Sequence, residues 1–447
     1  MTGTINILNA KILLRDGLFE GGIHICFGKI KKIGRKTNLP KAEENINAKR
    51  LIALPGLIDA HVHLRDLNLS YKEDFYTGTC AASVGGFTTV LDMPNTFPPT
   101  DSIERLKEKI ELAKNKIIVN VGFHALPPKN PEEIDDMVKL GVKSFKLYFN
   151  LFKDEDLKNN ALKETLKKCA LLNVPLTIHG EDGEKINKIK NFILKKGKKD
   201  LYSFLKAHSK EIEVSGIKKA LNLIKKEFKN GKAYFCHVST LKSLNEIKKN
   251  KFLVEVSPHH LFLTKEKLLR LKGIALTLPP LRSKFEAEAL WKKTIKGFVD
   301  VIASDHAPHT IEEKIKENYW EVSPGIPGLE TTLPLLLTKV NQGEISLQKL
   351  AELLAYNPSR IFNLRLKGEL KEGFNADITL INLKKHFKIE SEKFFSKAKY
   401  SPFNGFKCVG KPVKTIVSGK LVMEDGEIIA EKGSGFIIGE KTNEVSS

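Results

Sequence analysis

The chain has 447 residues, 41% hydrophobic and 28% charged, which is the balance of a soluble globular protein. No apolar run of about 18 residues is present, which excludes a membrane-spanning helix, and five scattered cysteines without a CxxC pair disfavour a disulfide framework or a thiolate zinc site. The net charge of +21 comes from lysines interleaved with glutamates, as on a solvated surface, so we expect no nucleic-acid partner.

The N-terminal segment, residues 1–52, is expected to form short strands. It opens with "INILNAKILL" and continues with "GGIHICFGKIKKIG", and both stretches have β-propensity and glycine turn signals. It lacks the basic, apolar and small-residue regions of a secretory signal in that order. We therefore expect a cytoplasmic protein.

Residues 53–364 alternate between strands and helices. Eight nearly continuous apolar runs, typical of parallel strands covered on both faces, lie at 54–64, 88–94, 117–126, 142–150, 174–182, 232–239, 252–260 and 298–309. Amphipathic segments separate them, including one in which Asp101 and Glu104 have capping-box spacing. This alternation predicts an α/β fold, a (β/α)8 TIM-type barrel that forms the catalytic domain.

The C-terminal segment, residues 365–447, returns to β-type sequence. "ADITLINL" and "VKTIVSGKLVMEDGEII" contain short apolar runs and an Asp-Gly turn signal. We expect residues 1–52 and 365–447 to pair into one small β-sandwich domain beside the barrel.

Polar residues gather at the carboxyl ends of the predicted barrel strands. In a barrel these ends converge on one face, where catalytic residues lie. A His-x-His pair on a strand also directs both imidazoles to the same side, because side chains alternate. The residues in question are His61, His63, Asn95, Lys146, His179, His237, Asp305, His306 and His309.

Lys146 is unusual, because it lies inside an apolar strand where an unpaired ammonium is costly. Carbamylation by CO2 would convert it into an anion able to bridge two metal ions, and Asp305 would add a hard carboxylate ligand. A His-x-His pair alone is a weak signal, and His179 or His237 alone could be a hydrogen-bonded core histidine. Together, these residues at separate strand ends indicate a metal site.

The motifs that carry these residues resemble the cyclic amidohydrolases, and within them the dihydroorotase family. The similar stretches are "DAHVHLRD", "DMPNT", "FKLYFN", "IHGED", "CHVS", "SDHAPH", "PGIPGLET" and "SPFNG", which span nearly the whole chain. The resemblance implies two zinc ions per subunit, one held by His61, His63 and Asp305 and the second by two further histidines. It assigns His179 and His237 to that second zinc, with carbamylated Lys146 as the bridge.

The implied reaction is the reversible hydrolysis of the cyclic amide of dihydroorotate to N-carbamoyl-aspartate, the third step of pyrimidine biosynthesis. A hydroxide between the zinc ions would attack the ring carbonyl, and Asp305 would carry the proton to the leaving nitrogen. The exocyclic carboxylate of the substrate suits the planar fork of Arg65. The resemblance places Asn95 and His309 beside Arg65 in that carboxylate site.

Other interpretations of single residues remain open. Arg65 could instead form a surface ion pair with Asp66 or Glu73, and Asn95 could be a turn residue. Relatives often have alanine where this chain has Gly180, and bacterial relatives have a ring-contacting asparagine where it has Leu278. Some dihydroorotases lack the bridging lysine and use one zinc, whereas this chain retains the lysine.

Two alternative functions compete with this one. A hydantoinase, dihydropyrimidinase or allantoinase would share the metal ligands, but its neutral ring substrates would leave Arg65 without a partner. A non-catalytic homologue would act as a scaffold for a partner such as aspartate transcarbamoylase. Loss of metal ligands is typical of such scaffolds, and this chain keeps all of them; an active enzyme is compatible with the same association.

Overall fold

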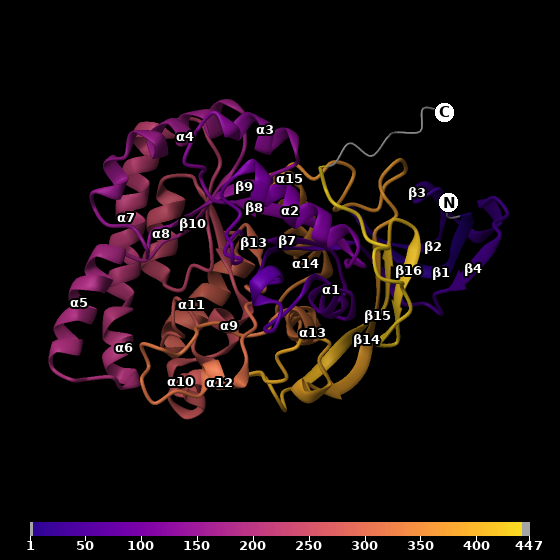
Figure 1. Cartoon of the computed structure of the whole chain (residues 1–447). Helices are drawn as coiled ribbons and strands as arrows, with labels where there is room; N and C mark the ends of the chain where they lie inside the picture. The colour runs from indigo at the N-terminus through magenta and orange to yellow at the C-terminus, as the bar shows by residue number, and fades with distance from the viewer. Residues whose placement is uncertain (1–2, 440–447) are drawn as a thin grey trace.

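The structure, a computed structural model, describes residues 3–439 and is centred on a parallel eight-stranded barrel. Its strands are neighbours in chain order (Figure 1): β6 (Leu57–Val62), β7 (Phe87–Asp92), β8 (Asn120–Ala125), β9 (Ser144–Tyr148), β10 (Leu176–His179), β11 (Ala233–Phe235), β12 (Leu253–Val256) and β13 (Val301–Ile302). A parallel bridge between Val62 and His306 joins the first strand to the segment after the last. The predicted (β/α)8 barrel is confirmed.

One principal helix follows each strand and covers the outside of the barrel (Figure 1). These helices are α1 (Phe75–Val84), α2 (Ile103–Lys114), α3 (Glu133–Lys139), α4 (Asn160–Leu171), α7 (Lys210–Glu227), α8 (Leu241–Lys249), α11 (Lys284–Ile295) and α13 (Leu329–Asn341). The N-cap of α2 is Ser102, whose side chain accepts from Arg105 N at 3.3 Å. The capping box predicted for Asp101 and Glu104 is therefore wrong by one residue, because Ser102 takes the extended backbone conformation that capping requires.

Shorter helices extend the connections at the carboxyl ends of three strands. They are α5 (Gly183–Lys195) and α6 (Leu201–Ala207) after β10, α9 (Pro258–Phe262) and α10 (Lys265–Leu271) after β12, and α12 (Ile311–Lys314) after β13. After α13 the chain forms α14 (Leu347–Ala351), a π-helical turn at Glu352–Tyr356 and α15 (Asn357–Ile361). No helix within residues 3–439 is long and apolar enough to cross a membrane.

The terminal segments form a second, mostly antiparallel sheet. It contains β1 (Thr4–Leu14), β2 (Gly17–Cys26), β3 (Lys29–Gly34), β4 (Glu44–Asn47), β5 (Ile52–Pro55), β14 (Ile378–Lys388), β15 (Lys407–Val417), β16 (Lys420–Glu424) and β17 (Glu427–Ile428). β5 pairs antiparallel with β14 and thereby joins the two ends of the chain, as the sequence predicts.

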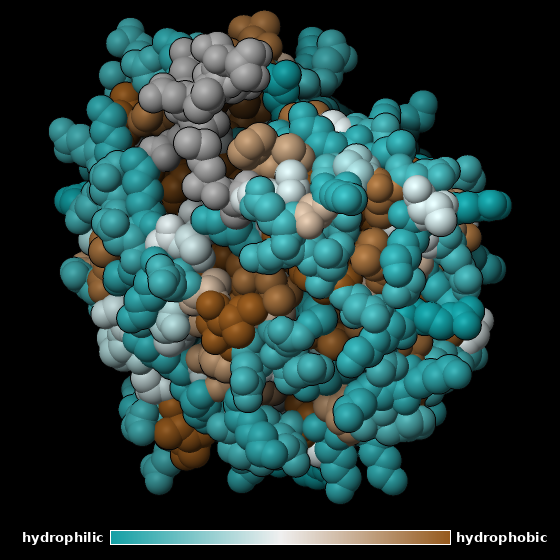
Figure 2. All heavy atoms as spheres, turned by 90° about the vertical axis from the view of Figure 1, so that its right-hand side faces the viewer, coloured by the Kyte–Doolittle hydropathy of each residue, from teal (hydrophilic) through white to brown (hydrophobic). Residues whose placement is uncertain are grey.

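This sheet lies along one side of the barrel (Figure 1). Val409 N of β15 donates to Thr338 Oγ1 of α13 at 3.0 Å, and Asn341 Nδ2 donates to Val409 O at 3.0 Å. Figure 2 looks onto this side of the molecule, where hydrophilic side chains cover most of the face and hydrophobic ones gather in smaller clusters between them. The sheet therefore packs against the barrel wall at α13.

Candidate active site

Four of the predicted histidines meet at the carboxyl end of the barrel. His61 lies in β6, His63 follows it, and His179 and His237 come at the ends of β10 and β11. The ring centroid of His61 is 5.3 Å from those of His63 and His237, and the rings of His179 and His237 are 4.6 Å apart. With Asp305 and Lys146, these residues form what we call the histidine cluster.

Asp305 joins the two histidines of the first strand. Its Oδ1 atom is 3.4 Å from His61 Nε2 and 3.3 Å from His63 Nε2. The three side chains are buried and offer three donor atoms within 4.8 Å of one another. Asp305 has a φ of 49°, an uncommon conformation for a residue with a side chain, so the segment after β13 is held in a strained shape that aims this carboxylate at the histidines.

Hydrogen bonds on the far side of each ring decide which nitrogen faces the cluster. His61 Nδ1 lies 2.8 Å from Glu255 Oε1, and His63 Nδ1 lies 2.6 Å from Asn95 Oδ1. Each ring therefore donates its Nδ1 proton outward and directs the Nε2 lone pair toward Asp305. Two lone pairs and a carboxylate facing one point are the donor set of a cation site.

His179 and His237 lie against each other in the same cluster. His179 Nδ1 is 3.1 Å from His237 Nε2, while His179 Nε2 is 2.8 Å from Glu181 Oε2. The other oxygen of Glu181 is 2.9 Å from Nδ1 of His208. The buried Nδ1 atom of His237 has no hydrogen-bond partner among the described residues.

Lys146 reaches the same region from β9. Only 1% of its surface is exposed, and its Nζ donates to Cys236 Sγ at 3.0 Å. Among the described residues it forms no ion pair, so the buried ammonium has a weak acceptor in place of a carboxylate. The structure thus brings Lys146 to the histidine cluster, as the sequence predicts.

Burial sets the protonation states of the cluster. It lowers the pKa values of His61, His63 and His237 well below the usual range, and the nearby Lys146 adds to the effect on each. It raises the pKa of Asp305 to about 6. Neutral imidazoles are the form that binds metal ions, so the rings are ready for ligation at neutral pH.

Arg65, Asn95 and His309 lie beside the histidine cluster and are here called the Arg65 cluster. Arg65 Nη2 is 3.1 Å from His309 Nε2, and Arg65 Nε donates to Pro308 O at 3.3 Å. The guanidinium is buried, with 6% of the residue exposed, and it forms no ion pair with any described residue.

The two carboxylates considered as alternative partners of Arg65 bind other residues. Asp66 pairs with Lys116 at 2.9 Å, while Glu73 accepts from Ser396 Oγ at 2.5 Å. Asn95 is more than a turn residue, because its Oδ1 atom faces His63. The Nδ2 amino group of Asn95 has no hydrogen bond to a described residue and is free to donate to a ligand.

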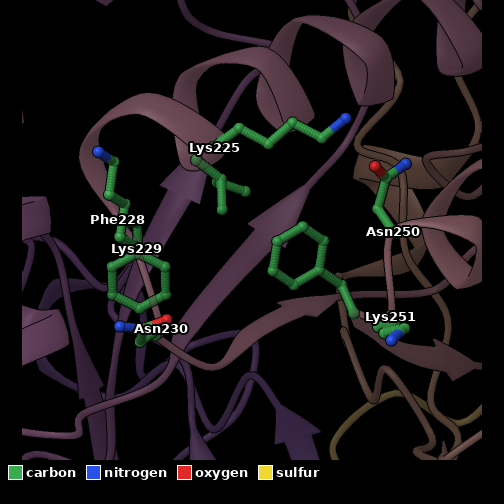
Figure 3. Close-up of a pocket in the computed structure, with 9 residues that line it drawn as sticks. Lys225, Phe228, Lys229, Asn230, Asn250 and Lys251 are labelled. Carbon is green, nitrogen blue, oxygen red and sulfur yellow. The ribbon is translucent and has the colours of Figure 1, made fainter.

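His259 and His260 are buried in α9 and belong to neither cluster. His260 Nε2 lies 2.9 Å from Pro279 O. A shallow hollow of about 420 Å³ lies at the other end of the barrel, where the chain enters β11 and β12 (Figure 3). It is lined mainly by lysines and asparagines, and none of the predicted site residues reaches it.

Comparison with known proteins places the barrel in a family. The amidohydrolase family matches residues 52–422, which include every residue of both clusters. The chain belongs to the amidohydrolase family. Membership makes the chain a hydrolase of a metal-dependent family, and His61, His63 and Asp305 are a group suited to hold the metal.

The chain also resembles individual curated proteins over most of its length. The dihydroorotase of Methanothermobacter thermautotrophicus is 40% identical over 91% of both chains, and that of Pyrococcus abyssi is 37% identical over 97% of this chain and 98% of its own. Among solved structures, the L-hydantoinase (dihydropyrimidinase) from Arthrobacter aurescens has a TM-score of 0.91 and 30% identity, covering 98% of this chain and 100% of its own.

The carboxylates that hydrogen-bond to the histidines of the cluster were not predicted from the sequence. Glu255 accepts from His61, from His237 N at 2.8 Å and from Tyr234 Oη at 2.7 Å, although burial raises its pKa to about 8. A signal was present, since Glu255 lies in the apolar stretch "FLVEV" just as Lys146 lies in "FKLYF". Glu181 and His208 gave no such signal, because they lie 27 residues apart in the long connection after β10.

Proposed function

We propose that this chain is a dihydroorotase, which hydrolyses the cyclic amide of dihydroorotate to N-carbamoyl-aspartate and closes it again in the reverse direction. The observation that carries the proposal is the buried, unpaired guanidinium of Arg65 beside the histidine cluster. A buried cation without a counter-ion calls for an anionic ligand. Dihydroorotate carries a carboxylate on its ring, whereas hydantoins and dihydropyrimidines do not.

His309 lies beside Arg65 as a neutral ring. Burial lowers its pKa to about 3, so the ring is neutral and only one nitrogen carries a proton. Nδ1 lies 3.2 Å from the ammonium of Lys72 and 3.4 Å from Glu313 Oε2, whereas Nε2 faces Arg65 and Pro324 O. Arg65 Nη2 and His309 Nε2 thus lie side by side at 3.1 Å, and the guanidinium has further N–H groups with which to bind a carboxylate.

The histidine cluster suits two zinc ions. His61, His63 and Asp305 would hold one, His179 and His237 the other, and carbamylated Lys146 would bridge them, as neutral nitrogens and carboxylate oxygens are ordinary zinc ligands. Zinc in these sites would supply an activated water at neutral pH and polarise the ring carbonyl. The orphaned Nδ1 of His237 and the lone pairs facing Asp305 are the observations that support a cation here.

Other steps of the proposed reaction are carried out by side chains of the protein. Arg65, Asn95 and His309 bind the substrate carboxylate and orient the ring over the cluster. Asp305 accepts the proton of the attacking water and delivers it to the ring nitrogen as the carbon–nitrogen bond breaks. Glu255 and Glu181 hold the imidazoles in the tautomers that ligation needs.

Substrate comparison tests the proposal. The zinc-loaded protein, prepared with bicarbonate, is assayed for ring opening of dihydroorotate, dihydrouracil, hydantoin and allantoin. We expect the largest kcat/KM for dihydroorotate. A larger value for one of the neutral rings would favour the hydantoinase-type function that the fold also supports, and no turnover of any ring would favour a scaffold.

A further inference from the structure

Lys314, at the end of α12, is a buried lysine that the reaction does not use. Its residue surface is 1% exposed, and its Nζ donates to Leu276 O at 3.0 Å, Ser323 O at 2.8 Å and Gly325 O at 2.6 Å. An ammonium has three donors, so the three carbonyl oxygens satisfy it completely. The ammonium of Lys314 thus holds three backbone carbonyl groups in place.

The carbonyl groups belong to two separate connections. Leu276 lies between β12 and α11, whereas Ser323 and Gly325 lie between α12 and α13. Gly325 N also donates to Leu276 O at 2.9 Å. A Cβ atom on Gly325 would lie 2.5 Å from Ala307 O, and its φ of +141° disfavours other residues, so this connection packs tightly on the segment that follows Asp305.

Pro324 lies between the two carbonyl groups that Lys314 holds in its own connection. Pro324 O is 3.1 Å from His309 Nε2. Lys314 therefore fixes the peptides on both sides of the carbonyl that lies against His309 Nε2. The preceding residue, Glu313, holds the other ring nitrogen, since its Oε1 pairs with Lys72 at 2.7 Å and Lys72 lies against His309 Nδ1.

We propose that Lys314 is a positioning residue for substrate recognition, which holds the 323–325 connection so that Pro324 O keeps His309 beside Arg65. The inference rests on the proposed carboxylate role of His309. A site whose loops are already ordered binds more tightly, because the ordering cost is not met on binding. Removing the ammonium would loosen the connection and weaken ground-state binding of dihydroorotate, while the metal ligands stay on their strands.

The first test is Lys314→Met, which keeps an unbranched side chain only one atom shorter and removes its donors. We expect KM for dihydroorotate to rise about tenfold, kcat to change by less than about threefold, and the zinc content to stay as in the wild type. Lys367→Met is the matched control, since Lys367 is also buried and pairs with Asp377, away from both clusters. That variant should lose stability without a change in KM.

A double-mutant cycle with His309→Ala separates positioning from general loosening of the fold. If Lys314 acts through His309, Lys314→Met adds little to KM in the His309→Ala background. Additive effects, or a fall in zinc content that accounts for the loss, would overturn the proposal. Lys314→Gln, which keeps two of the three N–H donors on a shorter side chain, should give an intermediate KM. If neither Lys314 variant folds, Lys314 is a residue of the core and the proposal is wrong.

The His309→Ala variant alone keeps the two hypotheses distinguishable. An unchanged KM in that variant would remove His309 from the carboxylate site and contradict that part of the proposed function. A raised KM in His309→Ala with an unchanged KM in Lys314→Met would leave the proposed function intact and contradict only the role of Lys314.

Discussion

The histidine cluster is built on strand ends, whereas the Arg65 cluster is built on connections between elements. Three of the six residues of the histidine cluster lie within β6, β9 and β10, and carboxylates such as Glu255 on β12 fix the rings. The Arg65 cluster depends on backbone carbonyl groups of Pro308 and Pro324. The metal-type ligands thus lie on the rigid strands of the barrel. The residues proposed to bind the substrate lie on connections, whose sequence can vary without disturbing those strands.

The largest effect is expected for Asp305→Asn, which changes the proton carrier without changing the shape of the side chain. Asparagine cannot accept the proton, so we expect kcat to fall by roughly 10²- to 10⁴-fold. The variant should fold normally and keep most of its metal, as circular dichroism and metal analysis would show. Asp136→Asn, an exposed position on α3, is the control; normal turnover by Asp305→Asn would refute the shuttle role.

Glu255→Gln tests whether the strand-borne frame sets metal affinity. Loss of the carboxylate that accepts from His61 should weaken metal binding by roughly 10- to 100-fold, measured by competition with a chelator. Glu213→Gln is a matched control, because Glu213 is a buried carboxylate that bonds Ser239 and Arg282 instead of a histidine of the cluster. Equal metal affinities for wild type and Glu255→Gln would show that the outer carboxylate is dispensable.

Arg65→Ala tests the other half of the comparison. Loss of a charge-assisted hydrogen bond to the substrate carboxylate should raise KM for dihydroorotate by roughly 10- to 100-fold, with zinc content unchanged. Arg65→Lys keeps the charge without the planar fork and should recover only part of the loss. If KM stays at the wild-type value in both variants, Arg65 lies outside the carboxylate site.

The smallest effect on turnover is expected at Glu330, a position that affects the stability of the fold. Burial raises the pKa of Glu330 to about 8, well above the value of an unfolded chain, so the folded state favours the protonated carboxyl group. That stabilisation is complete below about pH 4.5 and is lost as pH rises through 8. Glu330→Gln should therefore gain about 3 kcal/mol of stability over the wild type at pH 8 relative to pH 5, measured by denaturant unfolding. An identical difference from wild type at both pH values would contradict the shift.

The same comparison explains what the sequence could predict. The barrel, the pairing of the two chain ends and the meeting of His61, His179 and Asp305 follow from strand periodicity and from the convergence of strand ends. The terminal strands were expected to form a sandwich, and their joining into one sheet through β5 and β14 depends on a pairing that no local pattern encodes.

The residues that support the site from other connections could not be predicted from the sequence. Lys314 is one lysine in the charged run "EEKIKEN", and nothing in that run shows that its ammonium meets carbonyl groups from two connections. Lys72 and Glu313, which meet at His309, are more than two hundred residues apart in the chain. Such contacts follow from how connections fold over the barrel mouth, which the strand pattern leaves undetermined.

The central claim is that two metal ions and a carboxylate site act together on dihydroorotate. The most direct test measures zinc per subunit and dihydroorotate hydrolysis on the same purified sample, with mass spectrometry of the peptide that contains Lys146 in the presence of bicarbonate. We predict two zinc ions, turnover, and a carbamylated Lys146. Full turnover with a single zinc ion and an unmodified Lys146 would contradict the bridged site, and two zinc ions without turnover of dihydroorotate would contradict the function.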